Sequence, residues 1–112
     1  MLIAEEQLMY IDALSHSNDI DAIVVMKHST RCSISSMALS RLERSWNVSE
    51  KKVPTYFLDI LKHRDLSNKL AETYNLQHES PQILVIKNGK CIYSATHSEI
   101  SAPDISAAIL NS

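Results

Sequence analysis

The chain has few of the residues that mark flexible linkers, disulfide frameworks or nucleic-acid binding. One glycine and three prolines among 112 residues argue against Gly-rich or Pro-rich tethers. The two cysteines are separated by most of the chain, which fits neither a disulfide scaffold nor a zinc ribbon. The 11 basic and 13 acidic residues give a formal net charge of −2, so we expect no nucleic-acid partner.

A membrane span and a secretory signal are missing as well. No apolar run approaches the roughly 20 residues that cross a bilayer. Glu5 and Glu6 stand where a signal peptide would carry positive charge. We therefore expect no membrane association and a reducing, cytoplasmic location. The 45% hydrophobic content is enough for one core, and we expect a single domain over residues 1–112.

Hydrophobic periodicity predicts alternating helices and strands. Helical spacing covers residues 5–15, 34–46, 65–74 and a closing segment from Pro103, while apolar runs typical of strands cover 20–26, 53–60, 82–87 and 90–95. The turn Asn88-Gly89 joins the last two runs as a hairpin. The order α-β-α-β-α-β-β-α predicts an α/β fold of thioredoxin type, with a central mixed four-stranded sheet flanked by helices.

Some side chains have expected structural roles within this fold. Asp65 or Ser67 is expected to cap the third helix and Ser101 the last one. The expected core includes Met37, Leu42 and Trp46. Asp59, at the end of the second strand, is expected to form a turn and not to act as a catalytic acid.

Cys32 is the candidate catalytic residue. It lies where the first apolar run, ending at Met26, gives way to a polar turn over residues 27–35 and then to a helical pattern. Exposed backbone N–H groups and the positive end of a helix stabilise a thiolate, which is the nucleophilic form. The turn also contains Lys27, His28, Thr30, Arg31, Ser33 and Ser35. The alternative is that Cys32 is a small buried helix residue.

Ser80-Pro81 directly precedes the third strand, at the place where the thioredoxin layout has a cis-proline facing the reactive thiol. An X-Pro bond adopts the cis form at low energetic cost. A cis bond would turn the backbone of Ser80 outward to pair with an extended substrate chain. The alternative is a trans proline that merely starts the strand.

The residue three positions after Cys32 is Ser35, which can donate a hydrogen bond to a thiolate but cannot attack a disulfide. The chemistry is therefore of the monothiol kind: Cys32 takes a thiol cap from a client protein and a small thiol must release it.

Three separated segments carry a family resemblance: His28-Ser29-Thr30 with Cys32 and Ile34-Ser35, then Arg64-Asp65-Leu66-Ser67, then His78-Glu79-Ser80-Pro81-Gln82. They resemble the monothiol bacilliredoxins, redox proteins of the bacillithiol system related to general stress proteins. The resemblance implies a thioredoxin fold, a role in the stress response and removal of bacillithiol from S-thiolated client proteins by Cys32. The small thiol would be a co-substrate, with no bound cofactor.

The chain departs from the family's usual Thr-Cys-Pro-Ile-Ser at two positions. Arg31 precedes the cysteine, and Ser33 replaces the proline and restores a backbone N–H near the sulfur. Both changes favour the thiolate but leave open which small thiol is used. A glutathione-type thiol would suit the same fold.

The sequence gives less support for a functional role of the remaining candidate residues. His28 and His78 are interpreted as residues that flank the cleft and supply protons, or as ordinary loop histidines. Their spacing with Cys32 matches no tight ligand motif, so we expect no metal. Cys91 follows the hairpin tip and lies about 20 Å along the sheet from Pro81, too far for a disulfide with Cys32.

Two other functions remain open. Monothiol glutaredoxins also carry a cysteine followed three residues later by serine, and they dimerise around an iron–sulfur cluster with a small thiol as co-ligand. A redox-silent adaptor that binds extended partners through Ser80-Pro81 is the other alternative.

Overall fold

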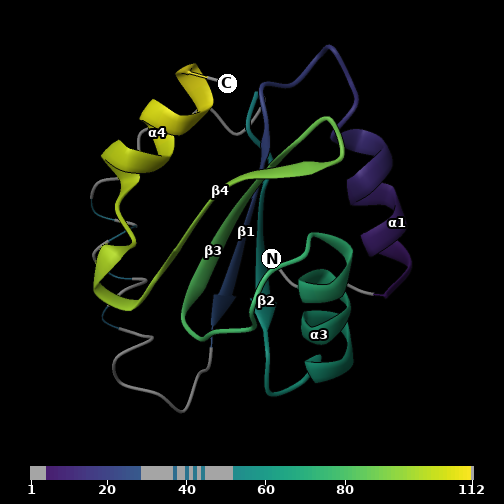
Figure 1. Ribbon diagram of the computed structural model, residues 1–112, viewed down its shortest axis with the longest axis vertical. Helices are drawn as coiled ribbons and strands as arrows, with labels where there is room; N and C mark the ends of the chain where they lie inside the picture. Colours follow the sequence, from purple (N-terminus) through teal and green to yellow (C-terminus); the bar gives the residue numbers. More distant parts are fainter. Residues whose placement is uncertain are drawn as a thin grey trace.

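The computed structural model describes residues 5–28, 37, 40, 42, 44 and 52–111. Its elements are α1 (Glu5–Leu14), β1 (Ile23–His28), β2 (Thr55–Asp59), α3 (Arg64–Thr73), β3 (Gln82–Lys87), β4 (Lys90–Thr96), the 3₁₀ turn η1 (His97–Glu99) and α4 (Ala102–Leu110) (Figure 1). Residues 37, 40, 42 and 44 are also helical, within the segment where a second helix is predicted. No described helix is long and apolar enough to cross a membrane.

The four strands form one mixed sheet in the order β2-β1-β3-β4. β1 pairs with β2 in parallel, and β3 pairs with β1 and β4 in antiparallel fashion. Nearly continuous apolar runs make β1 and β3 buried on both faces, as central strands are. The predicted α/β fold with a mixed four-stranded sheet is confirmed.

Helices cover both faces of this sheet, with α1 and α3 on one face and α4 on the other (Figure 1). Successive strand residues point to opposite faces, so β1 contributes Ile23 and Val25 to the α1/α3 core and Val24 and Met26 to the α4 core. Lys27 follows Ile23 and Val25 at the same two-residue spacing, so it lies on the α1/α3 side of the sheet. This alternation decides which side of the sheet each polar residue at the end of β1 faces.

A β-bulge in β4 changes the face of the sheet that its side chains cover. Val85 pairs with Tyr93 and Ile86 pairs with Cys91, so Ile92 is an extra residue in β4. Cys91 therefore packs against the α1/α3 core, although Tyr93, two residues further on, packs against the α4 core.

The hairpin tip is held by the C-terminal end of α1. Asn88 and Gly89 have φ values of 51° and 74°, as a type I′ turn requires. The backbone N–H of Asn88 donates to the carbonyl of Ser15 over 2.8 Å, and that of Gly89 donates to Ser15 Oγ over 2.9 Å. This end of the sheet is thereby fixed far from Pro81, which precedes the other end of β3.

Some local predictions are wrong. Met37 is 68% exposed whereas Leu42 is 5% exposed; five residues at about 100° each put the two on different helix faces. Trp46 lies outside the described residues. The N-cap of α3 is His63, so Asp65 and Ser67 lie inside the helix. Ser101 is the N-cap of α4 but makes no side-chain capping bond.

Candidate functional site

The predicted nucleophile Cys32 and the turn residues Thr30, Arg31, Ser33 and Ser35 lie outside the described residues, and their roles stay predictions. The structure does describe the strand that leads to them. β1 ends at His28, four positions before Cys32, and His28 pairs with Asp59 at the end of β2.

Three chain segments meet at this edge of the sheet. Lys27 pairs with Gln82, the first residue of β3, which directly follows Ser80-Pro81. On the other side of β1, the backbone N–H of Ile60 donates to the carbonyl of His28 over 3.0 Å. The ends of β1 and β2 and the start of β3 are therefore neighbours.

The Ser80-Pro81 bond is cis, as expected. Pro81 is buried, and its carbonyl accepts a hydrogen bond from the backbone N–H of His97 over 3.1 Å. The Ser80 hydroxyl oxygen is buried and has no hydrogen-bond partner among the described residues. The binding of a substrate at this bond stays a prediction.

The side chain of Gln82 holds the loop that precedes the proline. Its Nε2 donates to the carbonyl of Gln77 over 3.1 Å, and its Oε1 accepts from the backbone N–H of Glu79 over 3.4 Å. Gln82 is 3% exposed, so this amide has little competition from water. The residue between these anchors, His78, is thereby held close to β1.

Lys27 and His28 belong to β1, so their predicted place in the polar turn is wrong. Lys27 is 0% exposed and His28 is 5% exposed. Lys27 continues the row of Ile23 and Val25 on the α3 face, and its long side chain carries the ammonium group to helix α3 and the His78 loop.

Lys27, Ser67 and His78 form a polar cluster that the sequence did not reveal. Lys27 Nζ donates to the carbonyl of Ser67 over 3.1 Å and lies 3.3 Å from His78 Nδ1. Ser67 Oγ lies 3.0 Å from the same nitrogen, and Ser67 is 0% exposed. One sequence signal could have indicated this cluster: Lys27 follows Ile23 and Val25 at every second position of the strand, which places a lysine at a core position.

Burial dominates the protonation behaviour of this cluster. It lowers the pKa of Lys27 to about 8, because the charged form loses its hydration. Burial also lowers the pKa of His78, and the charges of Lys27 and Arg64 act in the same direction while Glu79 opposes them. At pH 7 the cluster therefore holds a charged lysine beside a neutral histidine.

His28 lies on the opposite side of the sheet from His78. Its ring meets Phe57 edge-on, with centroids 5.1 Å apart and an interplanar angle of 62°. Phe57 packs against the α4 core. His28 is thus a buried strand residue, and a catalytic role for either histidine stays a prediction.

Asp59 forms the turn after β2. Its Oδ1 accepts from the backbone N–H of Leu61 over 2.9 Å, and its carbonyl accepts from the N–H groups of Lys62 and His63. This agrees with the structural role expected from the sequence.

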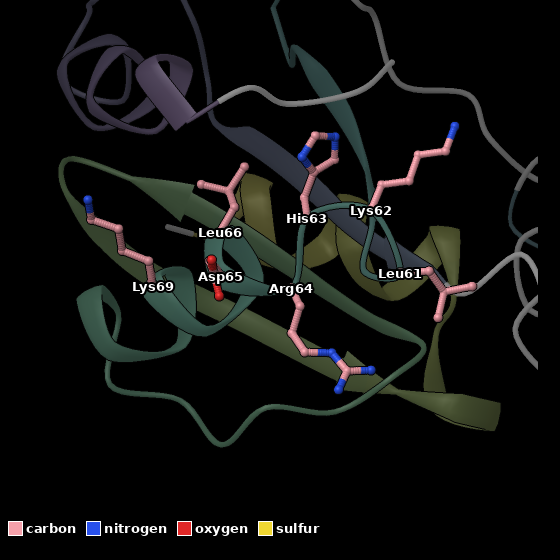
Figure 2. Close-up of a pocket in the computed structure, with 7 residues that line it drawn as sticks. All are labelled: Leu61, Lys62, His63, Arg64, Asp65, Leu66 and Lys69. Carbon is pink, nitrogen blue, oxygen red and sulfur yellow. The ribbon is translucent and has the colours of Figure 1, made fainter.

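A cavity of about 370 Å³ follows this turn (Figure 2). It is lined by Leu61, Lys62, His63, Arg64, Asp65, Leu66 and Lys69. Figure 2 shows the charged ends of Lys62, Arg64 and Lys69 pointing in different directions around it, with a single carboxylate, Asp65, among them. Three cationic side chains and one carboxylate give the lining an excess of positive charge. Sequence periodicity had identified only the start of a helix here.

Cys91 lies apart from this edge, in the half of β4 next to the hairpin. Its thiol donates to the carbonyl of Tyr93 over 3.3 Å. Burial raises the pKa of Cys91, which keeps the thiol protonated and a poor nucleophile.

The described residues contain no group of three or more His, Cys, Asp or Glu side chains able to hold a metal ion.

A family model described as monothiol bacilliredoxin BrxC matches residues 2–105. The chain belongs to this family. The family places it among thiol oxidoreductases, and the resemblance seen in the three sequence segments is confirmed.

Solved structures agree with the fold. A protein described as a candidate oxidoreductase with a thioredoxin fold has a TM-score of 0.77 and 27% identity, covering 96% of this chain and 91% of that one. A Malassezia sympodialis thioredoxin has a TM-score of 0.66 and 20% identity, covering 98% and 87%. Thioredoxin-2 of a malaria parasite has a TM-score of 0.61 and 20% identity, covering 81% and 82%. The two thioredoxins show the fold alone.

Proposed function

We propose that the chain is a monothiol thiol–disulfide oxidoreductase that removes a low-molecular-weight thiol, bacillithiol, from mixed disulfides on client proteins. Cys32 would be the nucleophile, and the reducing cytoplasm would be its setting. The observation that carries the proposal is the pairing of Lys27 with Gln82, because β1, which ends four positions before Cys32, ends beside the strand start that follows Ser80-Pro81. Membership of the bacilliredoxin family supports the same reaction.

The proposed reaction has two balanced exchanges. The Cys32 thiolate attacks the sulfur of the cap, a bond forms between the two sulfurs, and the client sulfur leaves with the electron pair as a thiolate. A second molecule of the small thiol then attacks the cap on Cys32, which releases a small-thiol disulfide and the Cys32 thiolate. Because Ser35 has no sulfur, the chain needs this external thiol.

The cavity next to the β2–α3 turn supports a small co-substrate. Its volume is at the lower end of the range for ligand sites, roughly 300–1,000 Å³. Lys62 and Arg64 both line the cavity. Their cationic groups would bind the carboxylates of an acidic small thiol.

Intact-mass spectrometry tests the proposal directly. Wild type, Cys32→Ser and Cys91→Ser are each mixed with a client protein that carries a bacillithiol or a glutathione cap. Transfer of the cap to wild type and Cys91→Ser, but not to Cys32→Ser, is the expected result, and the preferred cap identifies the small thiol. If no cap moves to wild type, the chain is not a thiol transferase.

A further inference from the structure

Lys27 has no evident role in stability. Its neighbours on the same face of β1, Ile23 and Val25, are aliphatic and fully buried, and a third aliphatic residue would continue that row. A buried ammonium is instead destabilising, as the lowered pKa of Lys27 indicates. A methionine would fill the same position without a buried charge, although it would lack the hydrogen bonds to Ser67 and His78.

The ammonium does determine the state of His78. An ammonium group only donates hydrogen bonds, so the nitrogen that faces it, Nδ1, must present its lone pair. Ser67 Oγ lies 3.0 Å from the same nitrogen, and its hydroxyl can donate to that lone pair. With Nδ1 as the acceptor, the proton of the neutral imidazole would be on Nε2, the nitrogen that neither partner contacts, and His78 is exposed.

The charges around His78 favour this neutral form. Lys27 from β1 and Arg64 from α3 both disfavour an imidazolium, and only Glu79, its neighbour in the loop, favours one. The two residues that pair with Lys27 on the neighbouring strands are uncharged: Leu58 of β2 and Gln82 of β3.

His78 is also held next to the proposed reaction site. The Gln82 side chain binds the backbone on both sides of it, and His78 precedes Ser80 by two residues. Lys27, which contacts the ring itself, lies on the adjacent strand β1. It precedes Cys32 by five residues in the sequence. One fixed N–H donor is thus presented at the edge of the sheet where the cysteine segment begins.

We propose that Lys27 is a positioning residue for thiol exchange: its contact with Nδ1 fixes the ring of His78 so that Nε2–H is directed outward as a hydrogen-bond donor to the leaving client thiolate. The inference rests on the proposed function. In the first exchange the S–S bond to the client breaks and its electron pair stays on the client sulfur. His78 donates a hydrogen bond to that sulfur without losing its proton, and the thiolate is later protonated by water.

The first test is the tautomer and titration of His78 in ¹⁵N-histidine-labelled protein, followed by proton–nitrogen correlation NMR. Wild type should show a proton on Nε2 and a titration midpoint below the ordinary value of about 6.5. In Lys27→Met the midpoint should rise toward that value and both tautomers should be populated. Lys27→Gln is the second variant should the methionine protein fail to fold.

The second test measures cap transfer between pH 5.5 and 8. Loss of a hydrogen bond to a charged group predicts a rate about tenfold lower or more for His78→Leu. His78→Gln, whose amide accepts from Lys27 and still donates, should retain most of the rate. In Lys27→Met the rate at neutral pH should fall toward that of His78→Leu, because the ring of His78 is no longer held through Nδ1. His16→Leu, at the opposite end of the sheet, is the matched control.

Two results would overturn the inference: a His78 midpoint that Lys27→Met leaves unchanged, or His78→Leu transferring the cap as fast as wild type. A wild type that transfers no cap would instead defeat the proposed function, and the catalytic role of Lys27 with it. The NMR titration would still decide whether Lys27 controls His78.

Discussion

Lys27 Nζ lies 3.3 Å from His78 Nδ1, although 51 positions separate the two residues in the sequence. The contact joins the end of a central strand to the loop before the cis-proline, and it places a buried cation against an exposed titratable ring. It has consequences for stability that are separate from those for catalysis.

Replacing Lys27 with methionine should stabilise the fold at neutral pH. The lowered pKa of about 8, against the ordinary 10.5, corresponds to roughly 3 kcal/mol for burying the charged form. Some of this gain is offset by the lost donor to Ser67 and His78, so we expect a free energy of unfolding about 1–3 kcal/mol higher. Urea denaturation at pH 7 measures it.

The advantage of Lys27→Met should shrink as the pH rises. Between pH 8 and 10.5 the unfolded chain keeps a proton on Lys27 that the folded chain has released, so this group makes wild type more stable as the pH rises through that window. The variant lacks that contribution. An equal difference between the two proteins at pH 7 and pH 10 would contradict the lowered pKa.

The thiol of Cys91 should react with alkylating reagents more slowly than that of Cys32. Burial raises its pKa and its thiol is hydrogen-bonded to Tyr93, so little thiolate is available at pH 7. Iodoacetamide at pH 7 should label wild type once, at Cys32, and should leave folded Cys32→Ser unlabelled. Labelling of Cys32→Ser in urea shows that the reagent is active, whereas rapid labelling of the folded variant would contradict the assignment.

The fold was predictable because its signals are local. Asn88-Gly89 selects a tight hairpin, and the apolar runs on either side of it have the lengths of strands. The bulge at Ile92 was not predictable, because it appears only in the cross-strand pairing of Val85 with Tyr93 and of Ile86 with Cys91. No local pattern in β4 shows where the extra residue lies.

The candidate site was predictable only in part. Ser80-Pro81 follows from the topology, which puts a proline before the third strand. Lys27 was misplaced because a lysine after an apolar run resembles the start of a turn, and only the packing of α3 and the His78 loop against β1 gives its ammonium partners. The cysteine turn, outside the described residues, stays a prediction.

Gly89→Ala should destabilise the hairpin. Gly89 has φ of 74°, and a Cβ there would lie 2.8 Å from His16 Nε2. The backbone strain and the contact together should lower the free energy of unfolding by about 1–2 kcal/mol. Because the imidazole can move away, His16→Ala should restore only part of the loss, as urea denaturation of the four proteins would show. Full recovery would mean that the contact, not the backbone conformation, requires glycine.

Removing the cations at the cavity should weaken transfer of acidic caps selectively. We expect Lys62→Gln combined with Arg64→Gln to raise KM about fivefold to tenfold for a client capped by an anionic thiol, since each lost charge-assisted hydrogen bond weakens binding. A neutral 2-mercaptoethanol cap should transfer at the wild-type rate. Lys52→Gln combined with Lys90→Gln, two exposed lysines outside the cavity, is the control for net charge. In 1 M salt, where screening acts over about 3 Å, wild type should lose much of its preference for the anionic cap. Equal wild-type KM values for both caps at low salt would show that the cavity does not recognise charge.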